Sequence, residues 1–278
     1  MLKKTFILFA LTALTLTSAF AGIDEIAIYN EQVGWTTPEA AAEASEQILA
    51  NVKTASKVTV VDMDTLADWV VKNHEDGTTD AIILFGYLPE TIYEPGNKQE
   101  DDSLVEKFIN GGNIVMNAAD YIFYVTDKGN GVIGEVGGTN GDKGLKTITN
   151  SNFDCWGNDD SFAPTADGKK YVPSLPAEYK STRPMKFSQI DADDNWEVEV
   201  SFGSNGDDFH DPVIVKSTVH GGRFAVVRQI ASAAPDRGAV FSEIIDNYFS
   251  TVITGGAAVN PAEKVSTTWG NLKAQAIK

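Results

Sequence analysis

Short apolar runs alternate with amphipathic segments through the first half of the chain. The apolar runs are rich in Ile and Val, which is typical of strands covered on both faces. Pro38 behind Thr37 marks the start of the first helix, and Asp64 is the expected N-cap of the second. The pattern predicts strands at residues 26–30, 57–62, 80–86 and 113–117, and helices at residues 38–52, 64–73 and 99–112. Regular alternation of strand and helix predicts right-handed crossovers and a parallel sheet.

This rhythm changes between about residues 126 and 218, where Gly, Asn and Asp become frequent. We expect a β-rich insertion there, built from edge strands or hairpins. Its short alternating runs are residues 131–138, 145–149, 171–175, 183–190 and 195–202. The core pattern resumes at residues 211–219 and 224–230 and ends in a helix at 237–253. The sequence therefore predicts one α/β domain at residues 22–253 that carries this insertion, followed by a tail at 254–278.

The N-terminus has the parts of a secretory signal peptide. Lys3 and Lys4 precede an apolar run that ends in Ala19-Phe20-Ala21. The run is short and Thr-rich for a membrane span. We expect cleavage before Gly22, which would leave a secreted or periplasmic protein without membrane insertion. The alternative is an N-terminal anchor that is retained.

Charge and residue usage exclude several kinds of partner and site. The formal net charge of -17 disfavours nucleic acid and anionic membrane surfaces. The single cysteine, Cys155, cannot form an internal disulfide, and the three histidines do not cluster. The glycines at 129–141 open no helix and so form no phosphate loop. Residues 191–202 begin like a calcium loop but have Trp196 and Phe202 where glycine and glutamate are needed. We predict no cofactor and no dedicated metal site, although weak calcium binding stays open.

Two segments resemble a known superfamily. Residues 80–91 (DAIILFGYLPET) and 104–120 (LVEKFINGGNIVMNAAD) resemble the class I glutamine amidotransferase-like superfamily, in the style of its trehalose-utilisation-type domains. Residues 211–229 and 238–253 look like the closing part of the same domain. The resemblance covers roughly residues 24–125 and 210–253. It implies a flavodoxin-like parallel sheet with helices on both faces.

The resemblance also shows which chemistry is missing. Amidotransferases of this superfamily place a nucleophilic cysteine on a tight elbow, and the matching positions here are Asn117, Ala118, Ala119 and Asp120. Thioester chemistry needs a thiolate, which none of these side chains can supply. Residues 86–89 match the oxyanion loop of the family, but without a nucleophile there is no oxyanion to stabilise. Glutamine hydrolysis is therefore excluded.

What remains is a candidate ligand pocket at the carboxyl ends of the strands, where such folds bind ligands. Its candidate lining residues are Asn30, Glu31, Tyr87, Asn117 and Asp120. Aromatic side chains near these positions suit stacking against sugars, although the same residue types also fill ordinary cores. The aromatics considered are Trp35, Tyr87, Tyr93, Tyr121 and Trp156.

Three hypotheses on function follow. The first is an exported, non-catalytic binding or scaffold module with a carbohydrate or other small-molecule ligand. The second is an enzyme on glycans or keto-sugars that uses Asp120 with Glu31 or His220 as acid and base. The third is a structural protein that joins partners through its tail. Protein partners are not identified by the sequence.

Overall fold

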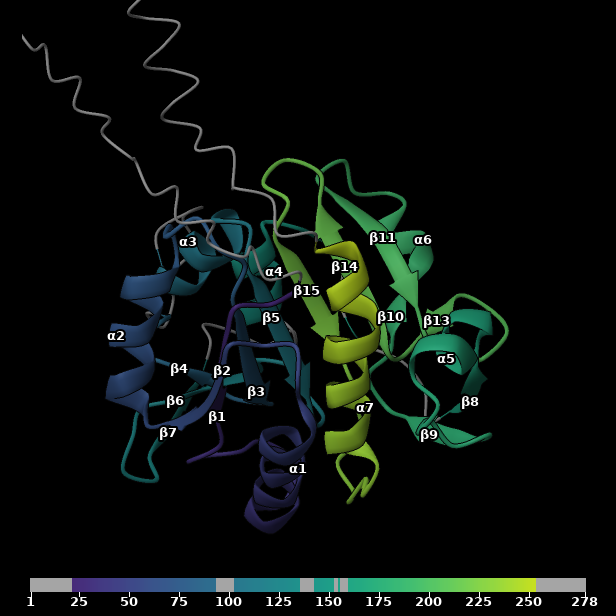
Figure 1. Ribbon diagram of the computed structural model, residues 1–278, viewed down its shortest axis with the longest axis horizontal. Helices are drawn as coiled ribbons and strands as arrows, with labels where there is room; N and C mark the ends of the chain where they lie inside the picture. The colour runs from purple at the N-terminus through teal and green to yellow at the C-terminus, as the bar shows by residue number, and fades with distance from the viewer. Residues whose placement is uncertain (1–21, 94–102, 136–142, 153–154, 156–159, 254–278) are drawn as a thin grey trace, which may run out of the picture.

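A computed structural model describes residues 22–93, 103–135, 143–152, 155 and 160–253. Its centre is a seven-stranded sheet in the order β11-β14-β15-β5-β3-β1-β2 (Figure 1). Five neighbouring strands are parallel: β2 (Lys57–Val61), β1 (Glu25–Tyr29), β3 (Ala81–Phe85), β5 (Ile114–Ala118) and β15 (Arg223–Val226). Antiparallel pairs add β14 (Val213–Ser217) and β11 (Trp196–Ser201) beyond β15. When these five strands are numbered in chain order, they lie across the sheet in the order 2-1-3-4-5, which is the flavodoxin-like topology expected from the sequence.

Helices cover both faces of this sheet, as predicted. One face packs against α1 (Pro38–Asn51), α7 (Arg237–Glu243) and the π-helix η1 (Ile244–Phe249), which continues into α8 (Ser250–Val252). Figure 1 shows α7 lying across the near face of the sheet. The other face packs against α2 (Met63–Asn73), α3 (Leu104–Asn110) and α4 (Lys143–Thr149). Because both faces are covered, β3 and β5 are buried along their whole length.

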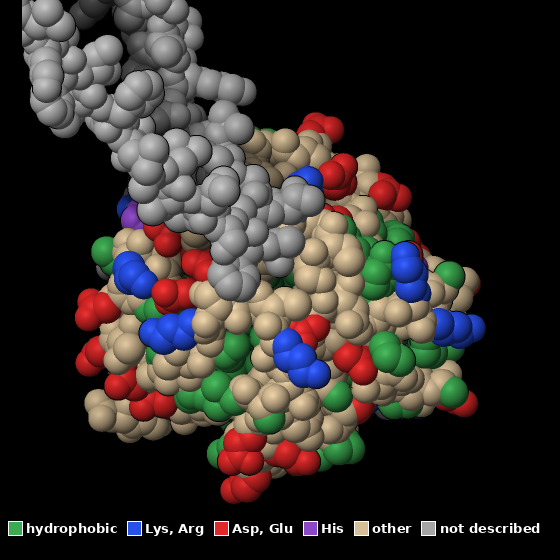
Figure 2. Space-filling view, in the orientation of Figure 1, with side chains coloured by type: hydrophobic (Ala, Val, Ile, Leu, Met, Phe, Trp, Pro, Cys, Tyr) green, Lys and Arg blue, Asp and Glu red, His purple; other side chains and the backbone are tan. Residues whose placement is uncertain are grey.

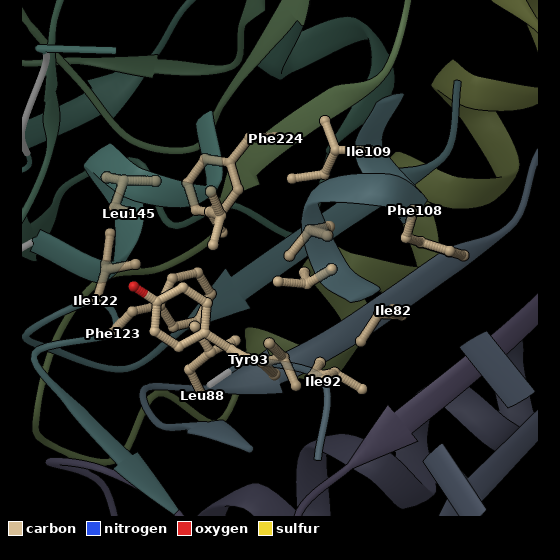
Figure 3. Packing of buried hydrophobic residues seen from close by; sticks show 14 of the residues in the cluster. Ile82, Leu88, Ile92, Tyr93, Phe108, Ile109, Ile122, Phe123, Leu145 and Phe224 are labelled. Carbon is tan, nitrogen blue, oxygen red and sulfur yellow. The ribbon is translucent and has the colours of Figure 1, made fainter. Parts of the chain in front are cut away.

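The core on the α2–α4 side is built from aromatic rings set among aliphatic side chains. Figure 3 shows Tyr93, Phe123 and Phe224 packed beside Ile122, Leu88 and Leu145. Phe123 and Phe224 meet edge to face, with ring centroids 5.9 Å apart. Tyr93 is 1% exposed. It therefore belongs to the core and not to a ligand surface.

The helix starts follow from capping residues, with one correction. Thr37 accepts a hydrogen bond from Ala40 N and Pro38 is the first helical residue of α1, as predicted. The expected N-cap of α2 at Asp64 is wrong. Asp62 caps the helix instead, because its backbone is extended and its carboxylate accepts from Thr65 N at 2.7 Å. The helix thus begins at Met63, one residue before the sequence estimate.

Helix α3 begins with a capping box that yields a testable stability change. Ser103 Oγ accepts from Glu106 N, and Glu106 Oε2 accepts from Ser103 N at 2.8 Å. Ser103→Ala is expected to lower the free energy of unfolding by about 1 kcal/mol, because both partners are buried and one donor loses its acceptor. Urea unfolding measures the change. Ser103→Thr keeps the hydroxyl and is the matched control, so equal losses in both variants would contradict a capping role.

The middle of the chain forms two small sheets as well as the edge of the large one. The first contains β4 (Leu88–Pro89), β6 (Val125–Asp127) and β7 (Ile133–Glu135). The second contains β10 (Met185–Lys186), β13 (Phe209–His210), β12 (Gly203–Ser204), β8 (Asp160–Pro164) and β9 (Tyr179–Ser181). Short helices α5 (Ala166–Tyr171) and α6 (Phe187–Ile190) lie between these strands in the chain. This part of the chain is β-rich, as expected.

Some individual predictions for this region are wrong. Residues 145–149, expected as a strand, belong to helix α4, where Leu145 and Ile148 are three apart and both buried. Residues 171–175 form no strand, because α5 ends at Tyr171 and a loop follows. The strand expected at 195–202 exists as β11, but it extends the large sheet.

Several sequence predictions fall on residues that the structure does not describe. These are the signal peptide at 1–21, the tail at 254–278 and Trp156. Among the helices of the described ranges, none has the length and apolar composition needed to cross a lipid bilayer.

Candidate functional site

The candidate residues lie together at the carboxyl ends of the parallel strands. Asn30 follows β1 and donates from Nδ2 to Ser45 Oγ of α1 at 2.8 Å. Glu31 is exposed and accepts from Met63 N at the start of α2 at 3.0 Å. The two neighbours therefore point to different helices. Asn30 braces α1, whereas Glu31 faces a cleft between the ends of β1 and β2.

Four partly exposed aromatic rings lie together at these strand ends. We call Trp35, Tyr87, Tyr121 and Tyr124 the aromatic platform. The Trp35 ring lies 5.5 Å from Tyr87, 4.8 Å from Tyr121 and 5.9 Å from Tyr124, between centroids. The rings come from three loops, which follow β1, β3 and β5. Burial, with the nearby Asp127 carboxylate, raises the pKa of Tyr87, so its hydroxyl stays protonated and can donate a hydrogen bond.

The backbone that carries the platform is strained. Trp35, Ala119, Tyr121 and Phe123 have φ values of 53°, 81°, 52° and 55°. Non-glycine residues adopt this left-handed region at an energetic cost, and such residues cluster at functional sites. Ala119 comes directly after β5, in the turns that lead to β6 at Val125. Its side chain is a methyl group, so this strained position presents no reactive group.

Asn117 is a fully buried brace below the platform. Its Oδ1 accepts from Gly86 N at 2.9 Å, and its backbone oxygen accepts from Val227 N and from Gln229 Nε2. Gly86 in turn accepts from Phe123 N. Asn117 thus links the loops after β3, β5 and β15. The same bond occupies the Gly86 N–H.

Asp120 takes part in an ion pair beside the platform. Its Oδ1 lies 3.1 Å from Arg183 Nε and accepts from Tyr121 N at 2.7 Å. The Arg183 guanidinium lies over the Tyr121 ring, 4.0 Å from the centroid. Asp120 and Arg183 are both largely buried. The pair therefore restrains Tyr121, with Arg183 against its ring and Asp120 bound to its backbone N–H.

An acidic cleft of about 540 Å³ lies at the ends of β1 and β2. Its side chains are mainly oxygen-bearing: Tyr29, Glu31, Gln32, Asp62, Asp64, Thr91, Asp127 and Asn130, with Lys128 as the one amine. Asp127 is completely buried and accepts a hydrogen bond from the Tyr29 hydroxyl. Burial and this carboxylate raise the pKa of Tyr29. Such a lining offers many acceptors for hydroxyl groups.

The structure separates the acid and base of the enzyme hypothesis. His220 lies in the turn before β15, whereas Asp120 follows the end of β5. Since β15 and β5 are parallel, a residue before β15 and a residue after β5 lie at opposite ends of the strands. Asp120 and His220 cannot act on one substrate. Glu31 is separated from Asp120 by the width of β3, and each has its own partner.

Within the described ranges no group of three or more His, Cys, Asp or Glu is arranged to hold a metal ion. In the former calcium-loop candidate, Asp193 Oδ1 accepts from Asn195 N and β11 begins at Trp196. This segment forms a turn and a strand. Cys155 is buried.

Sequence reasoning found part of this site. It named Trp35, Tyr87 and Tyr121, but missed Tyr124, Arg183 and the carboxylates Asp62 and Asp127. Tyr124 follows Tyr121 by three residues. A tight turn in this loop would have predicted that the two rings lie close together. Arg183 carried no signal, because it lies 63 positions after its partner Asp120 in a segment of different pattern.

The fold is that of a flavodoxin-like α/β protein, and its candidate site lies at the carboxyl ends of the parallel strands. No family model matches the chain, and no curated protein matches it. Among solved structures, it is similar to a thua-like protein from Bacteroides uniformis ATCC 8492, at 11% identity and a TM-score of 0.43 over 82% of this chain and 91% of the other. A thua-like protein from Parabacteroides merdae ATCC 43184 is similar at 12% identity and a TM-score of 0.38, over 84% of this chain and 91% of the other.

Proposed function

We propose that the protein is an exported, non-catalytic module that binds a carbohydrate on the aromatic platform. One observation carries the proposal: the rings of Tyr87, Tyr121 and Tyr124 all lie within 6 Å of the Trp35 ring, at the strand ends where doubly wound folds bind ligands. Flat aromatic rings stack against the apolar faces of sugars. The carboxylates of the acidic cleft at the ends of β1 and β2 would accept hydrogen bonds from the sugar hydroxyls.

The absence of catalysis rests on the turn after β5. Ala119 occupies the strained position there, and the neighbouring Asp120 is engaged by Arg183. We also propose a distant place in the class I glutamine amidotransferase-like superfamily. The strand order and the strained turn after β5 support this proposal. Export would follow from residues 1–21.

Thermal shift against mono- and oligosaccharides, with and without calcium, tests the proposal. A sugar at 100 times its Kd should stabilise the protein by about 2.7 kcal/mol. Trp35→Ala is expected to weaken binding at least tenfold, because Trp35 contacts all three other rings of the platform.

Tyr171→Ala is the matched control. Tyr171 is also a half-buried aromatic residue, but it packs on Tyr248 and Phe202, away from the strand ends. It should lose stability and keep its sugar affinity. A panel without any shift, or equal affinity losses in the two variants, would rule out the platform as a sugar site.

A further inference from the structure

The outer parallel strand of the sheet has an open edge. Strand β2 pairs with β1 along all five of its residues, and no other described strand pairs with it. Lys57 and Val60 are exposed in β2, whereas β3 and β5 have no exposed residue. The outward N–H and C=O groups of β2 are therefore available to another strand.

Beyond Lys57, this edge lacks the usual protection. Natural proteins guard exposed edges with charges, proline, bulges or a covering segment. After Lys57, β2 reads Val58-Thr59-Val60-Val61, which has no charge and no proline and consists of β-branched residues that favour pairing. Val60 is 40% exposed, and Leu49 on the neighbouring helix α1 is 44% exposed. The edge and its apolar border are what a covering strand would bury.

The described chain ends beside this edge. Ile253 O accepts from Gly22 N at 2.8 Å, three residues before β1 begins. The preceding π-helix is attached to the loop that leads into β2, since Asp246 accepts from Lys53 N and Thr54 N. Glu25 of β1 is level with Lys57 of β2. The chain therefore leaves the body at the end of the sheet where β2 starts.

We propose that the tail covers this edge, with residues 265–269 (VSTTW) added beside β2 as an eighth strand of the same molecule. This run is the richest in β-favouring residues within residues 254–278, and it lies between Pro261 and Gly270. The eleven residues before it can span roughly 35 Å, against roughly 17 Å for the length of β2. In a strand, Val265, Thr267 and Trp269 share one face, which would lie over Val60 and Leu49.

Charge favours the same arrangement. Residues 254–278 contain three lysines and one glutamate, whereas the whole chain has a net charge of -17. Figure 2 shows many carboxylates, with some basic side chains among them, on the visible surface over α1 and α2, the helices that precede and follow β2 in the chain. A basic segment is therefore drawn to an acidic body.

Amide hydrogen exchange of β2 tests the proposal. The full chain and a chain ended after Ile253 are compared at several concentrations. Covered β2 amides should exchange at least tenfold more slowly in the full chain, independent of concentration, while amides of β3 stay unchanged. Equal exchange of β2 in the two chains would overturn the proposal. Protection that disappears on dilution would also overturn it, because a second copy would then supply the covering strand.

Two point variants keep the test valid if the shortened chain folds poorly. Trp269→Asp places a charge on the face that would cover Val60, and Val60→Lys places one on the edge. Each should raise β2 exchange to the level of the uncovered strand. Lys278→Asp, beyond the proposed strand, is the control and should leave β2 protected. Normal protection in both Trp269→Asp and Val60→Lys would refute docking on this edge.

Discussion

Gly86→Ala is expected to lower the free energy of unfolding by about 3 kcal/mol. Gly86 has a φ of +90°, which L side chains rarely adopt, and a Cβ at this position would lie 2.5 Å from Gly34 O. The strained backbone and the clash with another backbone segment each cost about 1–2 kcal/mol or more. The clash cannot be relieved by rotating a side chain. Urea unfolding, followed by circular dichroism, gives the change.

Gly206→Ala separates the two costs. Gly206 has the same φ of +90°, but a Cβ there would meet no atom within 4 Å. This variant should lose only the conformational part, about 1 kcal/mol. Equal losses at both positions would mean that Gly34 and Gly86 do not approach as closely as described. Because Gly86 N–H also binds Asn117, Gly86→Ala should reduce sugar binding on the adjacent platform as well.

Asp80→Asn should remove a pH dependence of stability. Asp80 is fully buried before β3, and its carboxylate accepts from Glu25 N at 2.7 Å and from Thr78 Oγ1 at 2.9 Å. Burial outweighs these hydrogen bonds and raises the pKa of Asp80 from 3.8 to about 7. The folded protein therefore holds a proton on Asp80 that the unfolded chain releases near pH 4.

The sign of the effect follows from this proton. Below about pH 4 the Asp80 carboxyl is neutral in both states and costs nothing. Between pH 4 and 7 the unfolded chain binds fewer protons, so the stability of the folded protein falls as pH rises. Above pH 7 the loss is complete, at up to about 4 kcal/mol. Asp80→Asn is neutral throughout, so its stability relative to the wild type should increase across this window.

Urea unfolding at pH 4.5 and pH 8 measures the difference. Asp62→Asn is the control, because hydrogen bonds from Thr65 lower the pKa of the exposed Asp62 carboxylate and the contribution of Asp62 is therefore the same at pH 4.5 and at pH 8. The contribution of Asp62 is present above its unfolded pKa and is lost as pH falls through its folded pKa. Parallel pH curves for Asp80→Asn and the wild type would show that Asp80 is ionised in the folded protein.

The sequence predicted the parallel core because its strands are continuous runs of Ile and Val. A short apolar run such as Ala81–Phe85 is typical of a strand that is buried on both faces. It could not assign β11 to a sheet, since the alternating pattern of Trp196–Ser201 suits any half-covered antiparallel strand. It also could not identify α4, because five residues with Leu145 and Ile148 are too few to separate helix from strand.

The candidate site shows a similar limit. The end of a parallel strand was enough to bring Tyr87, Asn117 and Asp120 to one edge. Which of them faces outward depends on partners that are distant in the chain. Asn117 is turned inward by Gly86 and Gln229, and Asp120 is held by Arg183. Pairings between different loops leave no periodic signal in the sequence.

The hydrogen bond between Gly22 and Ile253 closes the described body into a near-continuous loop of chain. A short linker could join these two residues without crossing the sheet, and new ends could then be opened at an exposed turn such as Gly206. The same closeness would let the body be inserted as a unit into a surface loop of another protein. The closeness of Gly22 and Ile253 therefore makes the described body suited to circular permutation.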